Sequence, residues 1–173
     1  MSSKDIENAI RDIPDFPKKG IIFKDITPVL SDIDLLRKSI DMMVEPYMKQ
    51  KIDVVVGIES RGFIFGAPIA DKLDAAFVPI RKPGKLPWNT EKVEYELEYG
   101  TDTLEIHKDA ISEGQNVLIV DDLLATGGTA EAACKLISKI KGTIKGLVIL
   151  VELDFLKGRE KLNQYNVHSI VKY

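Results

Sequence analysis

The hydrophobic positions of this 173-residue chain fall into short continuous runs, separated by longer segments in which they recur every three or four residues. Short apolar runs that are rich in Val and Ile and bounded by turn residues are typical of buried strands. Such runs lie at residues 53–58, 76–80, 117–120, 146–151 and about 167–171. Because Pro79 has no N–H to donate, we expect the run 76–80 at a sheet edge or a strand end.

The segments between these runs have the apolar spacing of amphipathic helices. Helices are expected at residues 3–12, from Ser31 or Asp32 to about Pro46, after the turn at 60–62, from about Thr129 to Gly142, and near 154–163. Pro68 lies within the helix after 60–62, so the first turn or two of that helix are expected to be irregular. The prolines and the glycine between residues 13 and 30 predict a mostly irregular segment.

An inserted hairpin is predicted in the middle of the chain. Apolar and charged positions alternate over 92–99, which indicates a half-exposed strand that can turn at 100–102 and pair with 103–106. The stretch 83–91 is rich in Pro, Gly and Lys and predicts a mobile loop. Apart from this insertion, buried strands alternate with helices. The pattern therefore predicts an α/β fold, a single domain with a central parallel sheet flanked by helices on both faces.

Composition narrows the classes of partner. The formal net charge of -3 provides no global basic field, which argues against nucleic acid, so an anionic substrate would need a local basic pocket. The one cysteine, Cys134, excludes an intrachain disulfide and fits a reducing compartment. No apolar run reaches membrane-spanning length, and the first residues lack the apolar core of a signal peptide. A cytoplasmic protein without a membrane partner is expected.

The strongest chemical signal is the stretch 116–129, where a buried strand, two carboxylates and a small-residue loop lead into a helix. The loop Ala125-Thr126-Gly127-Gly128-Thr129 allows backbone N–H groups and the helix N-terminus to approach a phosphate. Asp121 and Asp122 would repel that phosphate but suit ribose hydroxyls, a magnesium ion or a developing cation. The spacing matches neither a Walker A loop nor a Gly-x-Gly-x-x-Gly motif. The alternative is an ordinary strand-to-helix turn with a solvated acidic strand end.

A second strand-to-helix turn, Gly57-Ile58-Glu59-Ser60-Arg61-Gly62, could bind another anion through Ser60 and Arg61. Taken alone, it is better explained as an arginine at a surface turn, but two such turns in one parallel sheet suit a ligand with two phosphate groups. A basic group, Arg81, Lys82 and Lys85, begins at a strand end. It could serve the same anion or be a solvated charge run.

Two further segments have plain structural explanations when taken alone. Tyr95-Glu96-Leu97-Glu98-Tyr99-Gly100 reads as alternating strand chemistry, and the phenylalanine of Phe23-Lys24-Asp25-Ile26 could fill the core or stack on a flat heterocycle. His107 and His168 lie far apart, with no second ligand at short spacing. The sequence therefore gives no sign of a metal cage built from side chains, nor of a Cys–His nucleophile pair.

In combination, these motifs resemble the type I phosphoribosyltransferases, which bind 5-phosphoribosyl-1-diphosphate (PRPP). The segment Val120 to Thr129 carries the superfamily signature. The segments Phe23-Lys24-Asp25-Ile26-Thr27-Pro28 and Tyr95 to Gly100 are similar to the adenine-specific branch, and the resemblance extends from Pro14 to about residue 160. It implies an α/β fold with an N-terminal hood at about 1–30 and a flexible lid at about 83–102.

The resemblance also implies roles for particular residues. The loop Ala125, Thr126, Gly127, Gly128 and Thr129 would bind the 5′-phosphate, and Asp121 and Asp122 would face the ribose. The diphosphate would be bound by Ser60, Arg61, Arg81, Lys82 and Lys85, some of them from a partner subunit. Phe23 and Leu123 would sandwich the purine, and backbone groups near Ile22 and Lys24 would read its edge. Glu98, in the lid, would handle the proton of N9.

The implied reaction converts adenine and PRPP to AMP and diphosphate, with Mg²⁺ bound to PRPP and a homodimer as the assembly. Two alternatives stay open at this point. One is a phosphoribosyltransferase for another purine, such as xanthine, which would keep the PRPP motifs. The other is a PRPP-sensing regulator without catalysis, which would usually carry a DNA-binding segment that this sequence lacks. The last dozen residues match poorly and support no functional inference.

Overall fold

The computed structural model describes residues 2–96 and 100–173, and the chain divides into two compact units, Met1–Met42 and Met43–Tyr173. Each unit is described by itself. Helix α3, Ile33–Val44, carries the chain from the first unit into the second. The carboxylate of Asp32 caps this helix by accepting the N–H groups of Asp34 and Leu35 at 2.9 and 3.1 Å, as the sequence predicts. Within the described residues, no helix is both long and apolar enough to cross a membrane.

The first unit contains a β-hairpin that the sequence did not predict. Its elements are α1 (Ser3–Ala9), β1 (Arg11–Pro14), β2 (Ile22–Asp25) and α2 (Thr27–Ser31), followed by most of α3. Strands β1 and β2 pair antiparallel, so the expectation of a mostly irregular 13–30 is wrong, as is that of a first helix reaching residue 12. Four-residue strands are too short to show a clear period of two, and prolines flank the turn between them.

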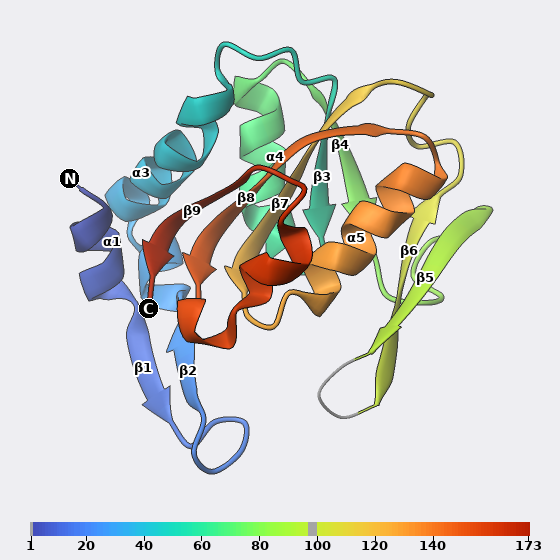
Figure 1. Cartoon of the computed structure of the whole chain (residues 1–173). Coiled ribbons are helices and arrows are strands. Elements are labelled where there is room, and N and C mark those ends of the chain that lie inside the picture. The colour runs from blue at the N-terminus through green and yellow to red at the C-terminus, as the bar shows by residue number, and fades with distance from the viewer. Residues whose placement is uncertain (1, 97–99) are drawn as a thin grey trace. The chain divides into compact units, whose positions relative to one another are not determined.

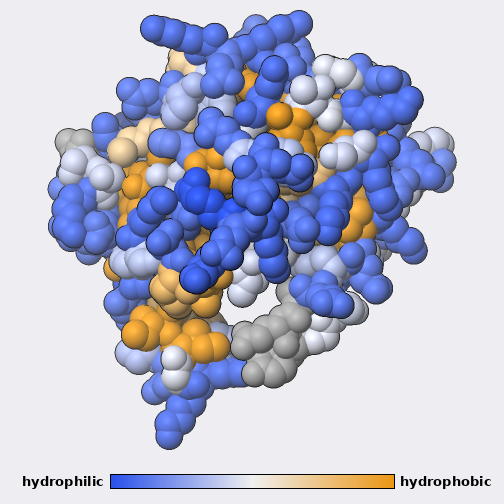
Figure 2. Space-filling model, in the orientation of Figure 1, coloured by the Kyte–Doolittle hydropathy of each residue, from blue (hydrophilic) through white to orange (hydrophobic). Residues whose placement is uncertain are grey.

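Local contacts hold this hairpin together. The N–H of Gly20, at φ +89°, donates to the carboxylate of Asp15 at 2.6 Å, and the rings of Phe16 and Phe23 meet edge to face at 5.3 Å. Figure 2 shows apolar atoms gathered over the hairpin. Phe16, Ile21 and Ile22 are each between 43% and 55% exposed, so the hairpin presents apolar surface to solvent.

The second unit is built on a five-stranded parallel sheet with the strand order β4-β3-β7-β8-β9. Its strands are β3 (Val54–Ile58), β4 (Ala76–Ile80), β7 (Asn116–Leu124), β8 (Thr143–Glu152) and β9 (Val167–Lys172). The helices are α4 (Gly62–Lys72) and α5 (Gly128–Lys139), with the 3-10 turns η1 (Glu45–Tyr47), η2 (Asp154–Leu156) and η3 (Gly158–Leu162). The antiparallel hairpin β5 (Thr90–Glu96) and β6 (Thr101–His107) completes it. The predicted α/β fold and inserted hairpin are confirmed.

The strand order reverses direction between β3 and β7. The crossover from β3 through α4 leads outward to β4, whereas the crossover from β7 through α5 leads the other way to β8. Since such crossovers are right-handed, the two helices must cover opposite faces of the sheet, as Figure 1 shows. Ligands bind at the carboxyl ends of the strands where the order reverses. The fold therefore indicates the gap between β3 and β7 as the place for a site.

The core lies between the sheet and its helices. All five residues of β3 and the last seven of β8 are buried, and α5 contributes its alanines, Leu136 and Ile137. Pro79 lies in the edge strand β4, as expected. Pro68 lies inside α4, which is helical from Gly62 onward, so the predicted irregular start is wrong. Residues near 154–163 form short 3-10 turns instead of one helix.

We predict that Phe65→Ala lowers the free energy of unfolding by roughly 3–5 kcal/mol, because it removes a large side chain from a close-packed core and leaves a cavity. Phe65 is fully buried in α4. Its neighbour Ile64 is 41% exposed on the same helix, so Ile64→Ala is the matched control and should cost less than about 1 kcal/mol. Urea unfolding followed by circular dichroism measures both. Equal losses in the two variants would contradict the packing described here.

Candidate active site

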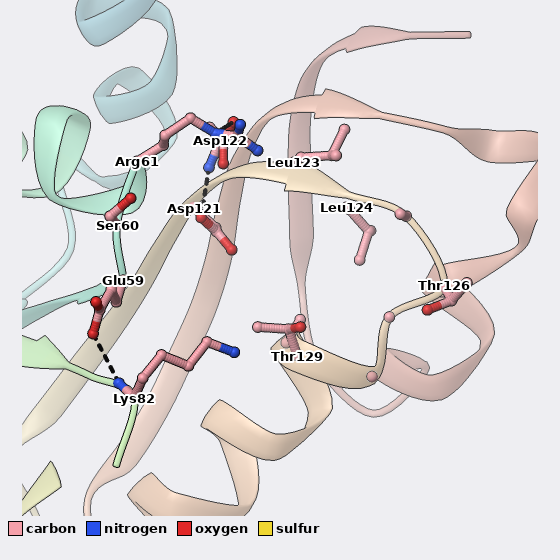
Figure 3. Close-up of a pocket in the computed structure, with 14 residues that line it drawn as sticks. Glu59, Ser60, Arg61, Lys82, Asp121, Asp122, Leu123, Leu124, Thr126 and Thr129 are labelled. Atoms are coloured by element: carbon pink, nitrogen blue, oxygen red, sulfur yellow. Dashed lines mark hydrogen bonds and ion pairs between the residues drawn. The ribbon is translucent and has the colours of Figure 1, made fainter. Parts of the chain in front are cut away.

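A cavity of about 350 Å³ opens at the carboxyl ends of β3 and β7, where the strand order reverses. It is lined by residues 59–61, Lys82 and residues 121–130, as Figure 3 shows. Two strand-to-helix turns thus form its walls, one leading into α4 and the other into α5. The structure brings together the two segments that the sequence marks as anion-suited.

The turn between β7 and α5 has the geometry of a phosphate-binding loop. Gly127 has φ +82°, a conformation that favours glycine. A side chain there would also collide with the backbone of Gly158, so the position requires glycine for both reasons. Helix α5 then begins at Gly128, and the N–H groups of its first turn have no intrahelical acceptor. Thr126 and Thr129 place hydroxyl groups on either side of the glycines. The loop offers backbone and side-chain donors to an anion.

Strand β7 does not end at the acidic pair, as the sequence suggested, but continues through Asp121 and Asp122 to Leu124. The added length pairs with β8, whose buried strand runs alongside as far as Glu152. Successive residues of a strand point to opposite sides, so the two carboxylates have different surroundings. This extension fixes the positions of both carboxylates on rigid backbone.

The two carboxylates are held in an environment that disfavours their full ionisation. Burial raises the pKa of Asp121 well above its ordinary range, and the neighbouring charge of Asp122 raises it further. Burial also raises the pKa of Asp122, although the guanidinium of Arg61, 2.6 Å away, opposes that rise. Asp122 is 5% exposed. Hydroxyl donors or a cation entering the cavity would relieve this strain by stabilising the charged forms.

The second turn is tied to the neighbouring strand by Glu59. Its carboxylate accepts the backbone N–H of Lys82 at 2.8 Å and the Nε–H of Arg81 at 3.3 Å. Burial raises the pKa of Glu59, but these hydrogen bonds and the charge of Arg81 outweigh it, so the pKa lies below its usual value. The sequence motif predicted no role for Glu59. The signal that could have identified it is an acid placed between a buried strand and the Ser-Arg pair.

Of the three predicted basic residues, the structure brings Lys82 to the cavity. Its ammonium pairs with Asp102, lies 3.2 Å from the hydroxyl of Tyr95, and sits over that ring at 5.7 Å. Burial lowers the pKa of Lys82, but the two partners outweigh it and leave the pKa raised. Arg81 instead bonds Glu59 and lies over the ring of Phe63 at 6.0 Å, and Lys85 is an exposed loop residue. Neither of them lines this cavity.

The predicted base-binding residues belong to both units. Leu123 lines the cavity in the second unit. Ile22, Phe23 and Lys24 form most of β2 in the first unit, where the ammonium of Lys24 lies 2.6 Å from the carboxylate of Asp12. Glu98, the predicted proton-handling residue, lies outside the described residues. Among the residues that the structure covers, no group of three or more His, Cys, Asp or Glu side chains could hold a metal ion.

Comparison with known proteins gives a consistent set of matches. The model of the phosphoribosyl transferase domain family matches residues 25–171. An adenine phosphoribosyltransferase of Thermoanaerobacter sp. (strain X514) is 56% identical over 173 residues, covering 100% of both chains. The crystal structure of the Thermoanaerobacter pseudethanolicus enzyme is similar at a TM-score of 0.96, with 55% identity over 99% of this chain and 100% of that one.

The yeast enzyme provides a structure with a bound base. The adenine phosphoribosyltransferase of Saccharomyces cerevisiae, complexed with an imino-altritol bisphosphate and adenine, is similar at a TM-score of 0.92 and 44% identity. The match covers 97% of each chain. A relative with the same fold therefore binds a bisphosphate and a purine base in one crystal structure.

We predict that Asp121→Asn raises the free energy of unfolding at pH 7, by roughly 0.5–2 kcal/mol, as often happens when a strained functional residue is replaced. The folded pKa of Asp121 lies above its unfolded value, so the folded protein loses stability as the pH rises from about 4 through the folded pKa. The variant lacks this titration, so its advantage should vanish below about pH 4. Urea unfolding at several pH values measures the difference.

Asp109 is an exposed aspartate, so Asp109→Asn serves as the control and should change the free energy of unfolding at pH 7 by less than about 0.5 kcal/mol. A variant Asp121→Asn that is less stable than the native protein at pH 7 would contradict the argument. It would mean that the carboxylate makes favourable contacts that exceed the cost of its burial.

Proposed function

The chain belongs to the phosphoribosyltransferase family, among the adenine phosphoribosyltransferases, and we propose that it transfers the 5-phosphoribosyl group of PRPP to N9 of adenine. The products are AMP and diphosphate, so the reaction salvages a free purine base as a nucleotide. The observation that carries this proposal is the cavity between β3 and β7, which has an anion-suited turn on each side and two carboxylates between them. PRPP has phosphate groups at both ends of a ribose, and the arrangement matches that order.

The loop Ala125–Thr129 binds the 5′-phosphate in this proposal. Its glycines allow backbone N–H groups to approach the phosphate oxygens, and the start of α5 adds further donors. The hydroxyls of Thr126 and Thr129 complete the donor set. Asp121 and Asp122 then accept hydrogen bonds from the ribose hydroxyls, which explains why an acidic pair lies before a phosphate loop, with two residues between the pair and the loop.

The opposite turn binds the diphosphate. Ser60 and Arg61 line the cavity there, and Lys82 reaches it from the end of β4. The ammonium of Lys82 has three N–H donors, so it can contact an anion as well as Asp102 and Tyr95. Arg81 and Lys85 remain candidates for the same anion, either after the loop moves or at a partner subunit's site. A homodimer and a cytoplasmic location both remain predictions.

Mg²⁺ enters with PRPP in this proposal. It prefers oxygen ligands in octahedral geometry and usually combines one or two carboxylates with substrate phosphates. Asp121 and Asp122 supply such oxygens beside the place proposed for the ribose and diphosphate, so the donor set fits. The ion would neutralise charge on the departing diphosphate. Arg61 and Lys82 act in the same direction from the protein.

The chemical step is an attack of adenine N9 on the anomeric carbon as diphosphate leaves with inversion. Positive charge develops on the ribose, where Asp121 and Asp122 stabilise it, while cationic side chains stabilise the leaving group. The proton of N9 needs an acceptor, and Glu98 is the proposed one. Leu123 and Phe23 are proposed to enclose the base, with the backbone near Ile22 and Lys24 reading its edge. Closure of the segment 83–102 would exclude water that could hydrolyse PRPP.

The first test is diphosphate release with PRPP, Mg²⁺ and each purine base in turn. We expect AMP from adenine and at least a hundredfold slower turnover with hypoxanthine, guanine or xanthine, because a base with a 6-oxo group leaves polar groups of the site unpaired. Preference for another base would keep the PRPP site but overturn the assignment of the base. Tight PRPP binding without turnover on any base would favour a non-catalytic regulator.

The second test is Glu98→Ala. We expect turnover to fall by roughly 10²–10⁴-fold, the usual contribution of general acid–base catalysis, while the affinity for PRPP stays nearly unchanged. Glu94→Ala, an exposed glutamate in β5, is the matched control and should keep native turnover. Unchanged turnover in Glu98→Ala would remove that residue from the mechanism without affecting the assignment of substrates.

A further inference from the structure

An ion pair between a buried carboxylate and a half-buried guanidinium lies at the end of β8 and does not line the cavity. Glu152, the last residue of the strand, is 2% exposed. Arg159 in η3 donates two parallel hydrogen bonds to the carboxylate of Glu152, from Nε to Oε1 at 2.9 Å and from Nη2 to Oε2 at 2.5 Å. The hydroxyl of Ser169 donates to the same carboxylate, and the ammonium of Lys172 lies 3.4 Å away. The carboxylate is therefore bound from both β9 and η3.

The guanidinium of Arg159 is fixed by β9 as well. Its Nη1 donates to the carbonyl of Val167 at 2.7 Å, and its Nη2 donates to the hydroxyl of Ser169 at 3.1 Å. Burial raises the pKa of Glu152, but the hydrogen bonds from Arg159 and Ser169 outweigh it and hold the pKa at about 2. Bidentate pairing of this kind fixes direction as well as distance, so the backbone around Arg159 has little freedom.

The residue before Arg159 touches the proposed phosphate loop. A side chain at Gly158 would collide with the carbonyl oxygen of Ala125 and lie 2.8 Å from the backbone nitrogen of Gly127. Conversely, a side chain at Gly127 would lie 3.0 Å from the Cα of Gly158. Two backbones that approach so closely support one another without any side chain between them. In Figure 1 this segment, in the red-orange of residues near 158, lies beside the start of α5.

The ends of β7 and β8 are also joined directly. The N–H of Leu153 donates to the carbonyl of Leu124 at 2.9 Å, immediately before the loop begins. The chain after Leu153 forms η2 and η3 and brings Gly158 back against the loop. Arg159, the next residue, bonds the carboxylate of Glu152 at the end of β8. The backbone of the loop Ala125–Gly127 therefore packs against η3, and η3 is hydrogen-bonded to β8 and β9 through Arg159.

We propose that Glu152 and Arg159 are positioning residues for substrate binding: their ion pair holds the backbone of Gly158 against Ala125–Gly127 and keeps the loop in the shape that binds a phosphate monoester. Neither side chain touches the substrate. The proposal deepens the proposed function and rests on its assignment of this loop to the 5′-phosphate. It distinguishes the loop from the proposed diphosphate turn at 59–61, which Glu59 ties to Arg81 and Lys82.

The test measures binding of ribose 5-phosphate and of inorganic diphosphate with Mg²⁺ to the full-length protein, by titration calorimetry. In Arg159→Gln we expect the dissociation constant for ribose 5-phosphate to rise roughly tenfold, because small misplacements of binding groups carry large penalties. The constant for diphosphate should change less than about twofold. Arg159→Lys keeps the charge but not the forked geometry, so it should fall between Arg159→Gln and the native protein.

Gly158→Ala displaces the loop without removing any charge, and it should also weaken ribose 5-phosphate selectively. Because it leaves the ion pair intact, it keeps the proposal testable if Arg159→Gln fails to fold. Lys135→Gln is the control: it removes an ion pair with Glu131 on α5, at 2.9 Å, without touching the loop. It should leave both constants at their native values.

Native affinity for ribose 5-phosphate in both Arg159→Gln and Gly158→Ala would overturn the proposal. An equal loss of both ligands would also overturn it, because it would show a general structural role. The failure of the proposed function looks different: the unaltered protein would then bind neither ribose 5-phosphate nor diphosphate. A selective loss of ribose 5-phosphate supports the positioning role whichever base proves to be the acceptor.

Discussion

The reversal of strand order between β3 and β7 is the constraint on which the candidate site depends. Right-handed crossovers that run in opposite directions from neighbouring strands cannot place their helices on the same face. The two strand-to-helix turns are therefore pushed apart, and the edge between them opens into a cavity. One turn presents the start of α5, and the other presents Ser60 and Arg61. The separation of the two turns therefore follows from topology before any side chain is chosen.

Charge is distributed unevenly across this opening. Asp121 and Asp122 lie side by side in a buried strand, and Arg61 compensates one of them directly. A site complete in itself would have paired both. Leaving like charges close together costs stability in the empty protein, and that cost is recovered when hydroxyl groups or a cation arrive. This arrangement agrees with the proposal that a ligand contributes part of the electrostatic balance.

Much of this could be predicted from the sequence because the relevant signals were local. Buried strands gave clear apolar runs, and small residues at a strand end indicated the loop that lines the cavity. The hairpin β1–β2 could not be predicted, since four-residue strands beside prolines have no measurable period. Nor could the pairing of Arg81 with Glu59, because it joins residues from two strands whose proximity depends on register. Lys82 lines the cavity and Arg81 does not, and the sequence could not predict which of these two neighbouring cations would do so.

Two carboxylates in this protein, Glu152 and Asp121, have pKa values shifted in opposite directions because their partners differ. Glu152 is surrounded by Arg159, Ser169 and Lys172, and its pKa is held at about 2. Asp121 is half-buried beside another carboxylate, and desolvation and that neighbouring charge raise its pKa. Burial opposes ionisation in both, so the difference lies entirely in the partners that the chain supplies. Arg159 and Ser169 stabilise the charged form of Glu152, whereas Asp121 accepts the N–H of Asp122 but lies beside a like charge. The proposed phosphate loop lies between these two environments, because Gly127 follows Asp121 and Asp122 in the chain and its backbone packs closely against that of Gly158, next to Arg159.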